Sequence, residues 1–143
     1  MKIAIGSDHA GYKLKEQIKS FLNRKKIAYK DFGTTSEESC DYPDFAYPVA
    51  EAVAKKKFDR GILICGSGVG VTIVANKVSG IRAVNAYDIE IAKQSREHGD
   101  CNVLCLAGRK IKRDTALKIV NAWLKTPFSN DERHARRIRK IEK

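Results

Sequence analysis

The stretch from Gly61 to Gly80 constrains the fold more than any other part of the sequence, because it joins a short apolar run to a helical pattern through a glycine-rich loop. The run Ile62-Leu63-Ile64 is unbroken, which is typical of a strand buried on both faces. Glycines occupy alternate positions directly after Cys65, at Gly66, Gly68 and Gly70. The next apolar residues recur at helical spacing, at Val71, Val74 and Ala75. The pattern predicts a strand, a loop with exposed backbone, and a helix whose first N–H groups point back toward Cys65.

Cys65 is the candidate reactive group of this loop. A helix N-terminus and nearby N–H donors both stabilise a thiolate, and the same amides suit a negatively charged ligand. The thiol is therefore a candidate base or nucleophile. An unpaired cysteine is also a common small apolar residue in protein cores, so a purely structural role at the strand end stays open.

The loop does not match the familiar phosphate-binding motifs. A dinucleotide fingerprint requires a third glycine where this chain has Val71, and the Gly-Lys-Ser/Thr of a P-loop is absent. A cysteine-phosphatase loop would place an arginine at the same position 71. The sequence thus argues against these nucleotide-binding and phosphatase functions.

Strand and helix patterns alternate along the chain. Strands are expected over residues 2–6, 27–32, 62–64, 81–86 and 102–107. Helices are expected over residues 11–26, 43–57, after the glycine loop, 88–98, 112–125 and 130–143. Such alternation predicts parallel strands with right-handed crossovers. We expect one domain over residues 1–143, an α/β fold in the form of a single Rossmann-like three-layer sandwich with a five-stranded parallel sheet and an extra C-terminal helix.

Ligands of open α/β sheets bind at the carboxyl ends of the strands, and several chemically active residues are expected there. Asp8 and His9 follow the first strand, Cys65 the central one and Arg109 the last one, while His98 ends the helix before the last strand. We expect these groups near one edge of the sheet. Simpler roles stay open, because Asp8 could cap a helix and His98 could complement a helix dipole.

Composition favours a cytoplasmic protein that binds acidic ligands. The 143 residues contain no apolar run near the roughly 18 that a membrane span needs, and the N-terminus does not resemble a signal peptide. Four cysteines show neither a Cys-x-x-Cys pair nor zinc-ligand spacing, as in a reduced intracellular protein. The net charge of +11 suits partners from nucleic acid to phosphorylated metabolites and does not choose between them.

The C-terminal helix carries much of this charge and few apolar residues. Pro127 ends the preceding helix, and Arg133 and Arg137 then share one face, with only Ile138 and Ile141 as an apolar stripe. Packing on a second copy of the chain would explain such a helix, and a solvated tail is the alternative.

Motifs spread over the whole chain carry a family resemblance. They are Gly-Ser-Asp-His-Ala-Gly at 6–11, Asp-Tyr-Pro-Asp at 41–44, Gly-Ile-Leu-Ile-Cys-Gly-Ser-Gly-Val-Gly at 61–70, Ala-Asn-Lys at 75–77, Gly-Ile-Arg-Ala at 80–83, Ser-Arg-Glu-His at 95–98, Asn-Val-Leu at 102–104, Gly-Arg at 108–109 and Arg-His-x-x-Arg at 133–137. With them the chain resembles the ribose-5-phosphate isomerase type B family, which also contains the galactose-6-phosphate isomerase subunits.

The resemblance implies an enzyme of the pentose phosphate pathway that interconverts ribose 5-phosphate and ribulose 5-phosphate through an enediolate, without metal or cofactor. It implies homodimers, sometimes paired into tetramers, with sites shared between subunits and no nucleic-acid or membrane partner. Cys65 matches the base, His98 the group that assists ring opening, and Ser67 and Asp8 complete the implied catalytic set. The implied substrate-binding residues are Asp8, His9, Tyr42, Gly66, Ser67, Gly68, Val69, Gly70, Gly99, Arg109, Arg133, His134 and Arg137. Tyr42 could equally be a packing residue.

Three positions depart from the family pattern. Gly99 follows His98 where asparagine is common, Ser67 replaces a frequent threonine, and Val69 stands where some relatives use a glutamate. Gly99 leaves open the isomerisation of a six-carbon sugar such as galactose 6-phosphate or allose 6-phosphate. A basic nucleic-acid-binding module is a further alternative, although no aromatic platform accompanies the charge.

Overall fold

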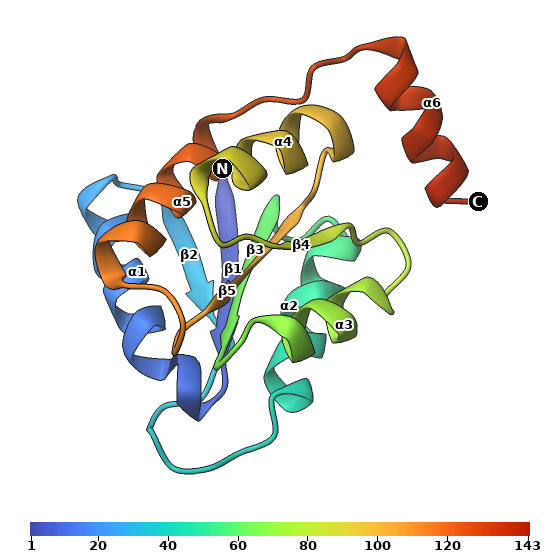
Figure 1. Ribbon diagram of the computed structural model, residues 1–143. Helices are drawn as coiled ribbons and strands as arrows, with labels where there is room; N and C mark the ends of the chain where they lie inside the picture. The colour runs from blue at the N-terminus through green and yellow to red at the C-terminus, as the bar shows by residue number, and fades with distance from the viewer.

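The computed structural model describes residues 1–143 and confirms the alternation of strands and helices (Figure 1). The strands are β1 (Lys2–Ser7), β2 (Ala28–Asp31), β3 (Arg60–Cys65), β4 (Ala83–Asn85) and β5 (Val103–Ala107). The helices are α1 (Tyr12–Arg24), α2 (Pro43–Ala54), α3 (Val69–Asn76), α4 (Ile89–Gly99), α5 (Arg113–Lys125) and α6 (Glu132–Ile141), and a short 3₁₀ turn spans His9–Gly11. None of the helices combines the length and apolar character that crossing a membrane requires.

The five strands form one parallel sheet in the order β2-β1-β3-β5-β4. The order reverses between β1 and β3, since the chain builds outward from β1 toward β2 and then returns to its other side. Such a switch point opens a crevice at the carboxyl ends of the two strands. Asp8 and Cys65 are the residues delivered there.

Helices cover both faces of the sheet, as the three-layer prediction requires (Figure 1). Because side chains alternate along a strand, Ile62 and Ile64 of β3 pack in the cluster formed with α1, α4 and α5. Leu63 and Cys65 face the other way, into the cluster formed with α2 and α3. All four side chains are buried, which explains the unbroken apolar run in the sequence.

The helix α6 stands apart from this sandwich (Figure 1). Its only buried residue is His134, while Ile141 is 65% exposed. The thin apolar stripe expected from the sequence is therefore not covered within one chain.

Candidate functional site

A cavity of about 380 Å³ opens at the carboxyl ends of β1 and β3. Its lining comes from residues at or after the ends of β1, β3 and β5, from the residue that precedes α2, and from α3. The lining residues are Asp8, His9, Ala10, Tyr42, Cys65, Gly66, Ser67, Val69, Gly70, Ile73 and Arg109. The rule that ligands bind at the carboxyl ends of the strands (the strand-end rule) thus predicted the place of this cavity correctly. Most of the expected site residues line it.

Cys65 is 5% exposed and lines the cavity at the end of β3. The Gly68 N–H donates a hydrogen bond to Sγ over 3.2 Å, as expected for a thiol beside a helix N-terminus. Cys105 lies on the same face of the sheet but is completely buried, and burial raises the pKa of its thiol to about 12. Of these two thiols, only Cys65 lines the cavity.

The glycine loop presents free backbone N–H groups to this cavity. Gly68 adopts a left-handed conformation with φ of 76°, and α3 starts directly after it. The amides of Gly70 and Val71 lie in the first turn of α3, where no intrahelical acceptor is available. Gly70 lines the cavity, so its amide is positioned to bind negative charge that develops next to Cys65.

Two residues that the sequence analysis missed hold this loop. Asn85 Nδ2 and the Tyr87 hydroxyl both donate to the Ser67 carbonyl, over 3.2 and 2.7 Å. The Ser67 hydroxyl in turn accepts the Val69 N–H over 3.2 Å. Asn85 is the last residue of β4 and Tyr87 lies two residues beyond it, so the strand-end rule applied to that strand would have placed both residues at this edge, although it could not have predicted their contacts.

Asp8 and His9 are both held by backbone contacts. Asp8 Oδ1 accepts the Gly11 N–H over 3.1 Å, so Asp8 caps the 3₁₀ turn that precedes α1, whereas the N-cap of α1 itself is Gly11. His9 Nδ1 accepts the Cys40 N–H over 3.2 Å. In the neutral ring the hydrogen must then lie on Nε2, which leaves a donor for a ligand. Cys40 was not among the expected site residues.

Arg109 supplies a positive charge to the cavity. Its backbone N–H donates to the Gly66 carbonyl over 3.0 Å, which places the residue beside the glycine loop. The guanidinium is exposed and makes no ion pair or hydrogen bond within the chain. It is thus available to an anionic ligand. No group of three His, Cys, Asp or Glu side chains is arranged to hold a metal ion.

The expectation that His98 lies at this same edge is wrong within one chain. The crossover helix α4 starts after β4 and runs back along the sheet, so His98 and Gly99 lie where β5 begins (Figure 1). Because β5 has five residues, this edge is roughly 17 Å from the cavity, at about 3.3 Å per residue. The α6 residues Arg133, His134 and Arg137 are found on the His98 side as well.

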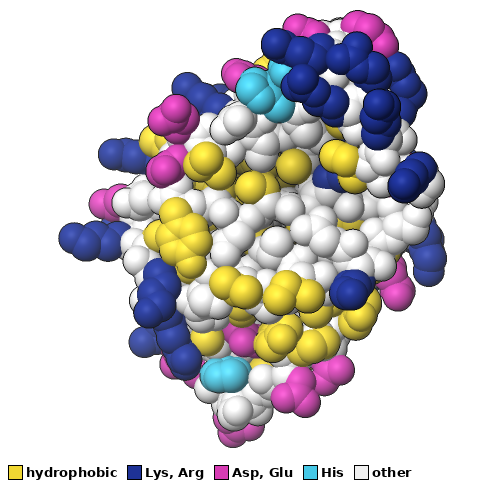
Figure 2. Space-filling view, turned by 45° about the vertical axis from the view of Figure 1, so that its right-hand side comes forward, with side chains coloured by type: hydrophobic (Ala, Val, Ile, Leu, Met, Phe, Trp, Pro, Cys, Tyr) yellow, Lys and Arg dark blue, Asp and Glu magenta, His cyan; other side chains and the backbone are white.

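These four residues form a second cluster. The rings of His98 and His134 stack with centroids 4.2 Å apart, and His134 Nδ1 lies 2.8 Å from Ser129 Oγ. Burial lowers the pKa of His134, and the charges of His98, Arg133 and Arg137 lower it further. Figure 2 shows the basic side chains gathered at this end of the molecule and hydrophobic side chains across the middle of the same face.

The same sequence pattern and fold occur in known isomerases. The sequence profile of the Ribose/Galactose Isomerase family matches residues 3–141. Ribose-5-phosphate isomerase B of Escherichia coli is 45% identical over 140 residues, which cover 98% of this chain and 93% of the relative. The structure of Clostridium thermocellum ribose-5-phosphate isomerase B superimposes with a TM-score of 0.97 at 52% identity, covering 99% and 95% of the two chains. Mycoplasma genitalium ribose-5-phosphate isomerase B, solved with bound ribulose-5-phosphate, gives 0.94 at 43% identity, covering 99% and 93%.

Proposed function

The chain belongs to the ribose/galactose isomerase family, and from this premise we propose that it interconverts D-ribose 5-phosphate and D-ribulose 5-phosphate with Cys65 as the base. The observation that carries the proposal is the position of Cys65, which lines a cavity beside unpaired backbone amides and Arg109. A phosphosugar needs these three features together, since it presents an acidic C–H, a carbonyl oxygen and a phosphate.

The reaction follows from this geometry. The Cys65 thiolate removes the proton from C2 of the open-chain aldose, and the electron pair moves toward the C1 carbonyl to give an enediolate. The Gly70 amide stabilises the negative charge where it develops. A proton passes from the C2 hydroxyl to the C1 oxygen, and the thiol returns a proton to C1, which yields the ketose with its carbonyl at C2. No atom is gained or lost, and the thiolate is regenerated.

The phosphate and ring-opening groups come from a second copy of the chain in this proposal. Within one chain, the cluster of His98 with α6 is too distant to reach a substrate at Cys65. A homodimer, alone or paired with another dimer, can bring the α6 of the partner subunit over the cavity, where its arginines join Arg109 around the phosphate. His98 of the partner subunit would then assist opening of the furanose ring.

Two further observations support this setting for the reaction. The four cysteines are unpaired, as in proteins of reducing compartments, which supports the cytoplasmic location expected from the sequence. The basic α6 surface (Figure 2) would be engaged by phosphate, which explains its charge without nucleic acid.

The proposal is tested by supplying ribose 5-phosphate in deuterated water to the wild type and to Cys65→Ala. We expect the wild type to form ribulose 5-phosphate with deuterium at C1, because the thiol exchanges with solvent between the two transfers. Cys65→Ala should lose about 100-fold or more in kcat while its circular dichroism is unchanged. A fully active Cys65→Ala would remove Cys65 from the base role.

A six-carbon substrate remains the second candidate because of Gly99. A Cβ placed there would approach Cys101 Sγ, at 3.3 Å, so a side chain requires only a small shift of that sulfur, and its absence widens the space next to His98. The same assay with galactose 6-phosphate and allose 6-phosphate separates the two candidates. We expect the highest kcat/KM with ribose 5-phosphate.

A further inference from the structure

The helix α6 is attached to the rest of the chain mainly at its two ends. At the start, His134 stacks on His98, and the Ser129 N–H donates to the Glu97 carbonyl over 3.2 Å. At the far end, Glu142 Oε1 accepts a hydrogen bond from Arg82 over 2.5 Å. A cavity of about 160 Å³ otherwise separates this end from residues 76–81.

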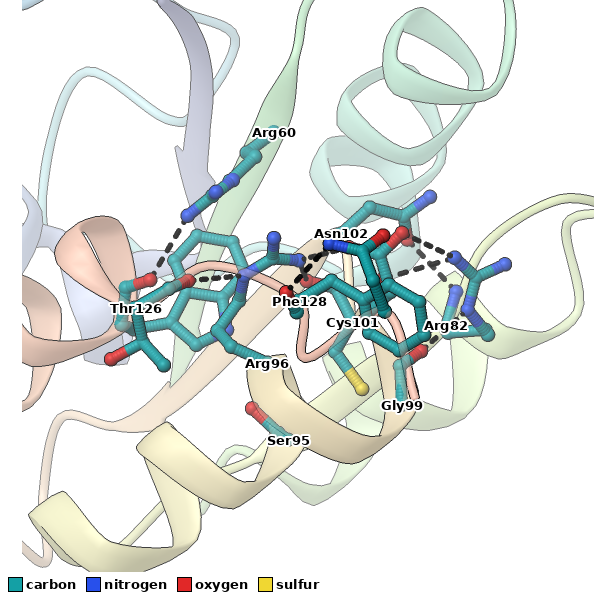
Figure 3. Close-up of polar contacts among 12 residues, drawn as sticks. Arg60, Arg82, Ser95, Arg96, Gly99, Cys101, Asn102, Thr126 and Phe128 are labelled. Atoms are coloured by element: carbon teal, nitrogen blue, oxygen red, sulfur yellow. Dashed lines mark hydrogen bonds and ion pairs between the residues drawn. The ribbon is translucent and has the colours of Figure 1, made fainter. Parts of the chain in front are cut away.

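Arg82 also holds the turn that carries His98. Its Nε donates to the Gly99 carbonyl over 2.8 Å, and a terminal nitrogen donates to the Asp100 carbonyl over 2.9 Å (Figure 3). Gly99 directly follows His98. One guanidinium therefore connects the turn after His98 to the residue that follows α6.

We propose that Arg82 and Glu142 are positioning residues, a clamp that fixes α6 relative to His98 so that both bind one phosphosugar as a single unit. The proposal rests on the proposed function, because it assigns Arg133, His134 and Arg137 to the phosphate. Within one chain α6 has too few apolar contacts to set its own position, and the clamp supplies a constraint that fixes it relative to His98.

The geometry of Arg82 suits this task. Its side chain is 16% exposed, and two backbone carbonyls fix the plane of the guanidinium. The nitrogen that faces Glu142 is thus already oriented, and less side-chain freedom is lost when the ion pair forms. A charge-assisted bond of this kind is stronger than an ordinary exposed ion pair.

If the charge of Glu142 acted only through local electrostatics, it would destabilise α6 and weaken phosphate binding. A carboxylate at the C-terminal end of a helix opposes the helix dipole and weakens the attraction of phosphate to the nearby arginines. If Glu142 had no clamping role, removing it would therefore stabilise α6 and improve phosphate binding. The clamp predicts that both properties worsen.

The test compares Glu142→Ala with Glu132→Ala. Glu132, at the start of α6, pairs only with Arg139 of the same helix and favours the dipole, so it is a matched control. We measure hydrogen exchange of the α6 amides without substrate, and KM and kcat for ribose 5-phosphate. Glu142→Ala should accelerate the exchange and raise KM, each about threefold to tenfold, with a smaller change in kcat. Glu132→Ala should change both much less.

A third variant, Arg82→Lys, keeps the charge but cannot contact both carbonyls and Glu142 together. Combined with Arg82→Lys, Glu142→Ala should add no further effect, because the two residues act as one unit. Unchanged or slower exchange in Glu142→Ala, or an effect no larger than that of Glu132→Ala, would overturn the clamp. Exchange is read without substrate, so a wild type inactive on ribose 5-phosphate would contradict the proposed function and leave the exchange result to decide the clamp.

Discussion

Gly68 shows how a single residue connects the sequence pattern to the chemistry of the loop. Its φ of 76° lies in the left-handed region, and a Cβ at this position would collide with the side-chain oxygen of Asn85. Asn85 in turn donates to the Ser67 carbonyl. The spacing of the glycines predicts an exposed backbone, but the contact with Asn85 crosses from another strand and has no local sequence signal.

Replacing Gly68 by alanine should therefore disturb both stability and catalysis. The energetic costs of the left-handed backbone and of the collision with Asn85 add up, so we expect a loss of roughly 2–3 kcal/mol in the free energy of unfolding. The displaced loop amides should lower kcat. Urea denaturation and the isomerase assay measure the two effects.

Gly80→Ala is the control for this variant. Gly80 has a similar φ of 86°, but a Cβ there would have no neighbour within 4 Å. It should lose only about 1 kcal/mol, the share of backbone strain, and keep its activity. Equal losses in the two variants would show that the contact with Asn85 is unimportant.

At the scale of elements, the sequence predicted the order of the strands and α-helices and the approximate bounds of all of them except α3, because apolar periodicity and the Gly and Pro signals agree along this chain. The prediction for His98 was wrong because it did not take the direction of α4 into account. The strand-end rule applies to residues that follow a strand, whereas His98 ends a crossover helix that returns to the other edge. The contacts of Arg82 and Tyr87 with backbone carbonyls were beyond sequence analysis, since any residue can supply a carbonyl.

The attachment of α6 should depend on pH through His134. Its pKa lies below the ordinary 6.5, first because of burial and then because of the neighbouring His98 charge. The unfolded chain consequently binds more protons just below pH 6.5, so the stability contributed by neutral His134 is present at pH 7 and is lost as the pH falls through the folded-state pKa. We expect the unfolding free energy to fall between pH 7.5 and 5.5, by less in His134→Gln.

An NMR titration of the imidazole measures this directly. His134 should titrate below 6.5 in the free protein, and at a higher pH when inorganic phosphate is bound, since phosphate favours the protonated ring. The Gln variant controls for other groups that titrate over the same range. A His134 that titrates above 6.5 without phosphate would contradict the structural account.

The whole molecule leaves an apolar surface uncovered next to its cavity. Val69 and Ile73, one turn apart on α3, are 50% and 56% exposed, and both line the cavity. Exposed apolar surface of this kind commonly marks a protein interface. For the proposed reaction, the cavity at Cys65 lacks the ring-opening group and the cluster at His98 lacks the base, and contact between two copies through this surface would bring the two together.

A mixed dimer tests this arrangement. Cys65→Ala and His98→Ala should each have low activity, because in both homodimers every site lacks one group. In a heterodimer of the two, purified through different affinity tags, one site combines both defects and the other has neither. If sites are shared, the heterodimer should regain about half of the wild-type activity, one site in two. If each chain formed its own site, both sites would remain defective and the activity would stay at the mean of the two parents. Mass spectrometry of the same preparation should detect only the two variant chains. Contaminating wild type is then excluded as the source of any gain.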